Sequence, residues 1–190
     1  MQQDVWDWIT CVWMLVGVYW LVSALRSKPV ARREKVMSRL FHLAIMTAAL
    51  ALLFSSSTGV GILSARLFPE DSRLAWAGLG LTVAGCAFAV WARALLGSNW
   101  SATVTVKQDH QLIRRGPYTI VRHPIYSGFL LGVLGTALAL GEVRGLVALA
   151  VAFAAWHIKA RTEEQFLVEQ FGNTYIDYGH EVKQLIPFVL

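Results

Sequence analysis

The side chains of this protein that could do chemistry gather in residues 115–128, RGPYTIVRHPIYSG. This segment lies between apolar runs long enough to cross a bilayer, and it concentrates arginine, histidine, tyrosine and proline. Pro124 keeps His123 out of helical geometry and suits the first turn of a helix. A helix N-terminus presents free N–H groups and a positive dipole end, which favour a carboxylate or a phosphate. The segment therefore predicts an anion-binding helix start at a membrane boundary.

Two kinds of side chain in this segment have alternative roles. The dipole of the helix disfavours a charged imidazole, so we expect His123 to form hydrogen bonds as a neutral ring. Arg115 and Arg122 would add charge-assisted contacts to a bound anion, or they would only anchor the membrane boundary. Tyr118 and Tyr126 would contact a ligand, or they would be interfacial aromatic residues.

A second polar group follows the last apolar run. It contains the adjacent carboxylates Glu163 and Glu164, with Lys159 and Arg161 close by. The sequence pattern by itself favours a solvated helix face for such a pair. The carboxylates could instead meet a cationic ligand group, and either basic residue could hold an anionic acceptor.

The elements that must position these residues are membrane helices. Hydrophobic residues make up 56% of the 190 residues and charged residues only 15%, which is too apolar for a small soluble domain. The apolar runs cover residues 6–25, 40–64, 74–96, 124–140 and 146–158. The last two runs are at the short edge of what spans a hydrocarbon core. We predict an all-α integral membrane protein with five transmembrane helices, a cytoplasmic loop before the fourth helix and a C-terminal helical tail.

Basic residues between the apolar runs orient these helices. Residues 26–39 carry six arginines and lysines against Glu34 alone, and residues 97–123 are also basic. The positive-inside rule places both segments in the cytoplasm, so the N-terminus lies outside and the polar residues face the cytoplasm. The first run has no basic region before it and no clear cleavage site, so we expect a retained anchor. Residues 97–123 are predicted to be a loop with a short hairpin near residues 103–107.

Small residues recur every four positions on the predicted fourth helix. Small side chains at this spacing let two membrane helices approach closely. The predicted contact joins this helix to the fifth one through Gly128, Gly132 and Thr136 and through Ala148, Ala152 and Ala155. The alternative is the ordinary frequency of glycine in membrane helices.

Several soluble-enzyme signatures are absent from the sequence. Gly78, Gly80 and Gly85 are wrongly spaced for a dinucleotide-binding fingerprint and lie in a membrane run, and no phosphate-binding loop with its lysine is present. The five histidines show no metal-ligand spacing, and Cys11 and Cys86 lie inside apolar runs. We expect neither a metal nor a nucleic acid as a partner.

Several separated motifs occur in an order that is found in one family. These motifs are Asn99-Trp100-Ser101, His110-Gln-Leu-Ile, Gly116-Pro-Tyr118, Arg122-His-Pro-Ile-Tyr126-Ser-Gly128, Arg161-Thr-Glu-Glu164, Phe171-Gly172, Tyr175, Tyr178 and Leu185-Ile-Pro187. The chain resembles a prokaryotic member of the isoprenylcysteine carboxyl methyltransferase family, which is related to the phospholipid methyltransferases. The resemblance covers roughly residues 95–188. It divides the chain into three N-terminal transmembrane helices (1–96) and a methyltransferase core (97–190) with a cofactor-binding loop, two transmembrane helices and a cytoplasmic tail.

The resemblance implies that a helical membrane fold binds S-adenosylmethionine without a Rossmann sheet. It places the cofactor contacts on His110, Gln111, Leu112, Ile113, Tyr118, His123, Pro124, Ile125 and Tyr126. It also implies catalytic, acceptor-side roles for Arg161, Glu163 and Glu164. In the isoprenylcysteine enzymes of this family the arginine precedes the glutamate by four residues. Here Lys159 has that spacing and Arg161 lies two residues before Glu163, so either cation could serve.

The expected function is therefore transfer of a methyl group from S-adenosylmethionine to a lipophilic acceptor that enters from the bilayer, for example the carboxylate of an isoprenylcysteine-like substrate. A carboxylate acceptor needs no strong base, whereas an amine acceptor would give its proton to a glutamate. The alternatives are a phospholipid N-methyltransferase and a non-catalytic or reductase-like membrane relative. We expect the protein in a prokaryotic inner or plasma membrane.

Overall fold

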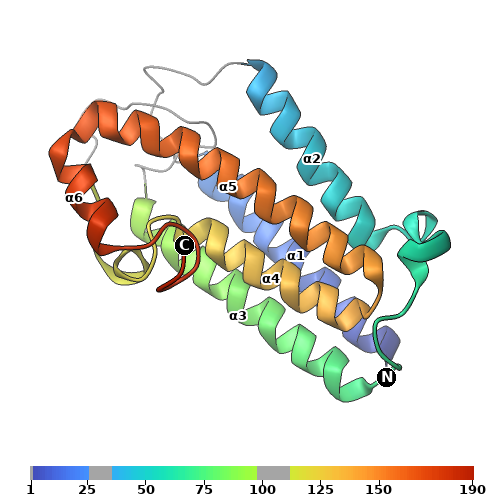
Figure 1. Ribbon diagram of the computed structural model, residues 1–190. Coiled ribbons are helices and arrows are strands. Elements are labelled where there is room, and N and C mark those ends of the chain that lie inside the picture. Colours follow the sequence, from blue (N-terminus) through green and yellow to red (C-terminus); the bar gives the residue numbers. More distant parts are fainter. Residues whose placement is uncertain (1, 26–35, 98–111) are drawn as a thin grey trace.

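The computed structural model describes residues 2–25, 36–97 and 112–190, and these form an all-α bundle (Figure 1). Its helices are α1 (Gln2–Ala24), α2 (Val36–Phe54), α3 (Ser72–Leu96), α4 (Pro124–Leu140), α5 (Val143–Phe171) and α6 (Asn173–Glu181). Short 3₁₀ turns are η1 (Ser56–Thr58), η2 (Gly61–Ser64) and η4 (Gly116–Thr119). The predicted hairpin near residues 103–107 lies outside the described residues. The prediction of an all-α protein is confirmed.

The helices differ in whether they could cross a membrane. α1, α3 and α5 are long and apolar enough, whereas the apolar parts of α2 and α4 are shorter. α5 continues well beyond the apolar run that ends at Ile158, and this extension carries the two glutamates. α2 ends at Phe54 rather than near residue 64, because the chain turns there through the serines of η1. The described residues therefore contain three candidate spans and two shorter apolar helices.

Glycines pack α4 against α3, so the predicted α4–α5 glycine contact is wrong. A Cβ atom added at Gly128 would lie 2.6 Å from the carbonyl oxygen of Gly85, and one added at Gly135 would lie 2.5 Å from that of Gly78. Only glycine permits backbones to come this close. α4 packs closely against α3 and not α5, because α3 has glycines at the positions that face the glycines of α4. The alanines of α5 instead help to form the core with Ala49 and other residues of α2 and α4.

Threonine and tryptophan side chains join the same helices in the bundle centre. The indole N–H of Trp13 donates to the hydroxyl of Thr136 at 3.0 Å, and Thr136 and Thr82 lie 3.3 Å apart. Gly132 faces the Trp13 ring, at 3.1 Å from an added Cβ. The small-residue face of α4 thus contacts α3 and α1, which leaves its N-terminal end open toward α5 and the tail.

The C-terminal tail folds back onto the start of α4. The Arg122 N–H donates to the Lys183 carbonyl at 2.8 Å, and the His123 N–H donates to the Gln184 carbonyl at 3.0 Å. The hydroxyl of Ser127 donates to the Leu185 carbonyl at 2.6 Å. These contacts bring the end of the chain against the segment that the sequence marks as reactive.

Candidate active site

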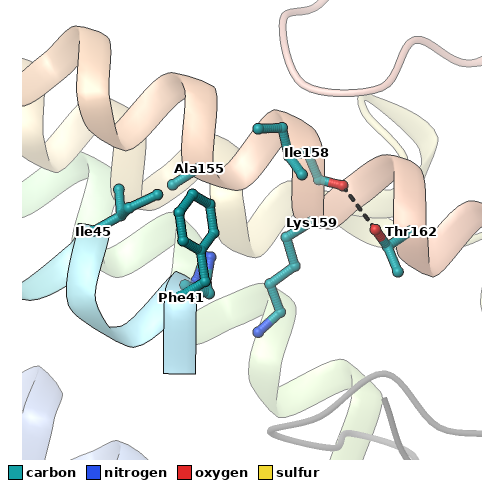
Figure 2. Close-up of a pocket in the computed structure, with 7 residues that line it drawn as sticks. Phe41, Ile45, Ala155, Ile158, Lys159 and Thr162 are labelled. Atoms are coloured by element: carbon teal, nitrogen blue, oxygen red, sulfur yellow. Dashed lines mark hydrogen bonds between the residues drawn. The ribbon is translucent and has the colours of Figure 1, made fainter. Parts of the chain in front are cut away.

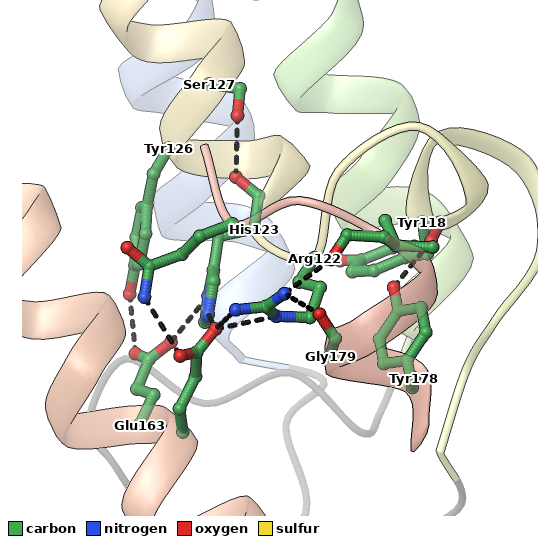
Figure 3. Close-up of polar contacts among 11 residues, drawn as sticks. Tyr118, Arg122, His123, Tyr126, Ser127, Glu163, Tyr178 and Gly179 are labelled. Carbon is green, nitrogen blue, oxygen red and sulfur yellow. Dashed lines mark hydrogen bonds and ion pairs between the residues drawn. The ribbon is translucent and has the colours of Figure 1, made fainter. Parts of the chain in front are cut away.

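A histidine at the start of α4 lies between two carboxylates of α5 (Figure 3). The Nδ1 atom of His123 is 3.5 Å from Oε2 of Glu163, and its Nε2 atom is 3.2 Å from Oε1 of Glu164. His123 is buried. It precedes Pro124, which begins α4, and this N-cap position aims its ring at α5. We refer to His123, Glu163 and Glu164 as the acidic cluster.

Aromatic rings extend the acidic cluster toward the bundle. The hydroxyl of Tyr126 donates to Oε1 of Glu163 at 2.5 Å. The rings of His123 and Tyr126 stack with centroids 5.6 Å apart, and Tyr126 stacks on Trp156 of α5 at 6.3 Å. These flat faces beside two carboxylates can hold a ligand that is both cationic and aromatic.

Arg122 connects the acidic cluster to the tail. Its Nε and Nη2 atoms each lie 2.8 Å from Oε1 of Glu164. Its Nη1 atom donates to the carbonyl oxygens of Gly179, at 3.0 Å, and Val182. All three guanidinium nitrogens are thus engaged by Glu164 and by the C-terminal end of α6, so Arg122 holds these two elements together.

Gln184 brings a neutral side chain from the tail to the acidic cluster. Its amide nitrogen donates to Oε2 of Glu164 at 2.9 Å. Its amide oxygen is buried and has no hydrogen-bond partner among the described residues. The carboxylate of Glu164 therefore receives Arg122 and His123 on one oxygen and Gln184 on the other.

The expectation of a neutral His123 is corrected by the two carboxylates. Burial lowers the pKa of His123, but hydrogen bonds and charge from Glu163 and Glu164 outweigh burial and raise that pKa above its ordinary value. The dipole of α4 acts in the opposite direction, but only as a partial charge. The two carboxylates thus stabilise the protonated imidazole relative to a histidine in water.

A small hollow that is open to solvent lies between α2 and α5 (Figure 2). Its lining is Phe41, His42, Ile45, Ala155, Ile158, Lys159 and Thr162. Lys159 is half-buried in this lining and lies one helical turn before Glu163, whereas Arg161 is exposed. The structure therefore places Lys159, not Arg161, between the hollow and the acidic cluster.

The predicted cofactor-binding residues do not all lie together. His123 and Tyr126 belong to the acidic cluster and its aromatic extension. Pro124 and Ile125 are buried in the first turn of α4. Leu112 and Ile113 are half-buried, and the hydroxyl of Tyr118 donates to the Ala92 carbonyl at 3.4 Å. His110 and Gln111 lie outside the described residues.

Trp156 and Gln184 reach the site although sequence reasoning did not select them. Trp156 precedes Glu163 by seven residues on α5, so helical spacing places both on one face. That spacing is a signal that could have found Trp156. No local pattern marks Gln184, because only the folded tail brings it to Glu164.

A family model described as phospholipid methyltransferase matches residues 74–174, which include most of α3, all of α4 and α5, and the whole acidic cluster. The chain belongs to the phospholipid methyltransferase family. The match thus covers the two helices that hold the acidic cluster, α4 and α5, and ends before Gln184 of the tail.

Curated relatives of this phospholipid methyltransferase family member are named as protein-S-isoprenylcysteine O-methyltransferases. A probable protein-S-isoprenylcysteine O-methyltransferase of Oryza sativa subsp. indica is 28% identical over 170 residues, which cover 82% of this chain and 89% of that protein. Protein-S-isoprenylcysteine O-methyltransferase B of Arabidopsis thaliana is 34% identical over 98 residues, or 49% of each chain. The chain thus spans about half the length of the Arabidopsis relative.

A solved structure shares the fold of this family member. It is the eukaryotic intramembrane Ras methyltransferase ICMT (isoprenylcysteine carboxyl methyltransferase), with a TM-score of 0.57 and 27% sequence identity. The likeness covers 78% of this chain and 53% of that one. It supports an integral membrane arrangement for the bundle.

Proposed function

We propose that this protein transfers a methyl group from S-adenosylmethionine to the carboxylate of a lipophilic, isoprenylcysteine-like acceptor. One observation carries the proposal: a partly buried acidic cluster follows, by one turn of α5, a lysine that lines an apolar hollow. The isoprenylcysteine O-methyltransferase names of the relatives agree with this chemistry.

The side chains and backbone groups around the acidic cluster fit S-adenosylmethionine. Its sulfonium and ammonium are cations, which suit the carboxylates of Glu163 and Glu164. Its adenine is a flat ring, which suits the faces of Tyr126 and Trp156. Its carboxylate suits the free N–H groups of the first turn of α4. When bound, this cofactor supplies an electrophilic methyl group.

The protein's own residues orient the acceptor and exclude water. Lys159 would hold the acceptor carboxylate, while Phe41, Ile45 and Ile158 cover its apolar chain. Leu185 of the docked tail is buried in the core and shields the cytoplasmic side. Alignment and a dry site are the main contributions that a protein makes to such a transfer.

The proposed topology has five spans, with the N-terminus outside and the acidic cluster at the cytoplasmic face of a prokaryotic inner or plasma membrane. The basic segments 26–39 and 97–123 support this orientation by the positive-inside rule. The acceptor would then enter the hollow from the lipid, and the cofactor would enter from the cytoplasm.

Phosphatidylethanolamine is the alternative acceptor, because the family model carries a phospholipid methyltransferase description. An amine acceptor would give a proton to Glu163, whose carboxylate already accepts a hydrogen bond from Tyr126. The lysine beside the hollow favours the carboxylate acceptor, since it attracts an anion and repels an amine that is protonated.

Proteoliposomes with methyl-labelled S-adenosylmethionine and either N-acetyl-S-farnesylcysteine or phosphatidylethanolamine test the function. We expect base-labile label on the farnesylcysteine. Replacing Lys159 with methionine should raise the KM for that acceptor about ten-fold, the loss expected from one charge-assisted contact. Replacing the exposed Arg161 with methionine should change it little. Label on phosphatidylethanolamine alone would support the alternative, and absence of cofactor binding would overturn both.

A further inference from the structure

Gln184 has a buried amide oxygen for which the described residues provide no donor. The residue is 7% exposed, and its Oε1 atom has no hydrogen-bond partner in the described part of the chain. A buried acceptor without a donor is costly, because it has lost its hydrogen bonds to water and gained none in the protein. Such a group in a native fold calls for a physical reason, and a binding role is one.

The tail backbone fixes where this side chain points. The Gln184 carbonyl accepts from the His123 N–H at 3.0 Å, and the next carbonyl, of Leu185, accepts from the Ser127 hydroxyl at 2.6 Å. The Leu185 side chain is buried in the core. The main chain of Gln184 is therefore held against α4 on both sides, and the bond from its amide nitrogen to Glu164 keeps the side chain at the acidic cluster.

The partners of Glu164 divide its surroundings into two sides. Arg122 and His123 both contact Oε1, so the two cations lie beside that oxygen. The amide nitrogen of Gln184 contacts Oε2. Because the amide nitrogen and oxygen share one carbon, the free Oε1 of Gln184 lies near the Oε2 side of Glu164. A single donor group beside the Gln184 amide could therefore meet both acceptor oxygens.

A ligand group that matches this pair is a primary ammonium. It has three N–H donors, no acceptor and a positive charge that the carboxylate attracts. Resting on the proposed function, we propose that Gln184 is a cofactor-binding residue whose amide oxygen accepts a hydrogen bond from the ammonium of S-adenosylmethionine. Its amide nitrogen meanwhile holds Glu164 for the same ammonium.

Calorimetry on the detergent-solubilised full chain tests this with two ligands. S-adenosylhomocysteine keeps the amino-acid end of the cofactor, and 5′-methylthioadenosine lacks it. The variants are Gln184→Met, which removes both hydrogen bonds, and Gln184→Lys, which keeps a donor for Glu164 and removes the acceptor. Lys183→Met is the control, because that side chain is exposed on the same tail. Thermal unfolding shows which variants fold. If Gln184→Met does not fold, Gln184→Lys alone provides the test.

Both Gln184 variants should bind S-adenosylhomocysteine about ten-fold more weakly, the effect of one hydrogen bond to a charged group. Their affinity for 5′-methylthioadenosine should match that of the wild type, as should both affinities of Lys183→Met. Wild-type affinity in Gln184→Lys would overturn the proposal, since a donor alone would then suffice. Equal losses for both ligands would also overturn it, and S-inosylhomocysteine would then show whether the adenine amine is the partner. A wild-type chain that binds neither ligand would instead refute the proposed function.

Discussion

His123 is the residue whose charge state the surrounding groups control most directly. Glu163 and Glu164 of α5 face its two ring nitrogens, Arg122 precedes it, and Gln184 contacts it from the tail. Burial lowers the pKa of His123, and the two carboxylates raise it by more, so the folded pKa lies above the ordinary 6.5. The folded protein therefore holds this proton more tightly than the unfolded chain does.

This linkage predicts a loss of stability at alkaline pH. The contribution of His123 is complete below about pH 6.5 and disappears as the pH rises through the raised pKa. The unfolding midpoint in detergent should fall as the pH rises above about 6.5, and it should fall less in His123→Gln. The exposed His180 provides the matched control, because His180→Gln should keep the wild-type slope. Parallel profiles for His123→Gln and the wild type would contradict the ion pairs.

The sequence could indicate some residues of the site but not their partners. Pro124 marks a helix start, so His123 and Tyr126 could be placed at its N-terminus from sequence. The expectation of a neutral imidazole considered only the dipole of its own helix and not the carboxylates of α5, which raise the pKa of His123. Arg122 could not be separated from a ligand-binding arginine, because its partners Gly179 and Val182 come from the distant tail.

At the scale of elements, the contact between α3 and α4 sets the position of the site. Gly85 and Gly128 face each other, and α4 begins four residues before Gly128. The sequence showed the glycines of α4 and those of α3 separately. It could not pair them, because small residues on α5 have a similar spacing and helix pairing depends on the whole bundle.

This contact predicts opposite effects for two glycines of the same helix. A Cβ at Gly85 would lie 2.5 Å from the Gly128 carbonyl oxygen, whereas a Cβ at Gly80 would meet nothing within 4 Å. Gly85→Ala should destabilise the protein by about 1–3 kcal/mol, as overpacking does. Gly80→Ala should be neutral or stabilise it by up to about 1 kcal/mol through helix propensity. Unfolding in detergent measures both, and equal effects would exclude the close α3–α4 approach.

At the scale of the whole molecule, the site forms only when the C-terminal tail docks against the start of α4 and against α5. α4 supplies the histidine, α5 supplies the carboxylates, and the tail supplies Gln184 and the carbonyls that Arg122 binds. The helices follow from apolar length and from Pro124, so the sequence predicted their order. The docked tail did not follow, since its polar backbone contacts have no period that a sequence displays.

Tail docking predicts that one buried leucine controls both stability and binding. Leu185 is 1% exposed and packs in the core cluster with Trp156, whereas Phe188, three residues later, is 93% exposed. Leu185→Ala should cost about 2–5 kcal/mol, the range for truncating a buried leucine. It should also weaken S-adenosylhomocysteine binding, because Gln184 and Arg122 depend on the docked backbone. Phe188→Ala removes a larger side chain and should change neither unfolding nor calorimetric affinity. If Leu185→Ala lowered stability but kept wild-type affinity, the tail would support the fold without forming part of the site.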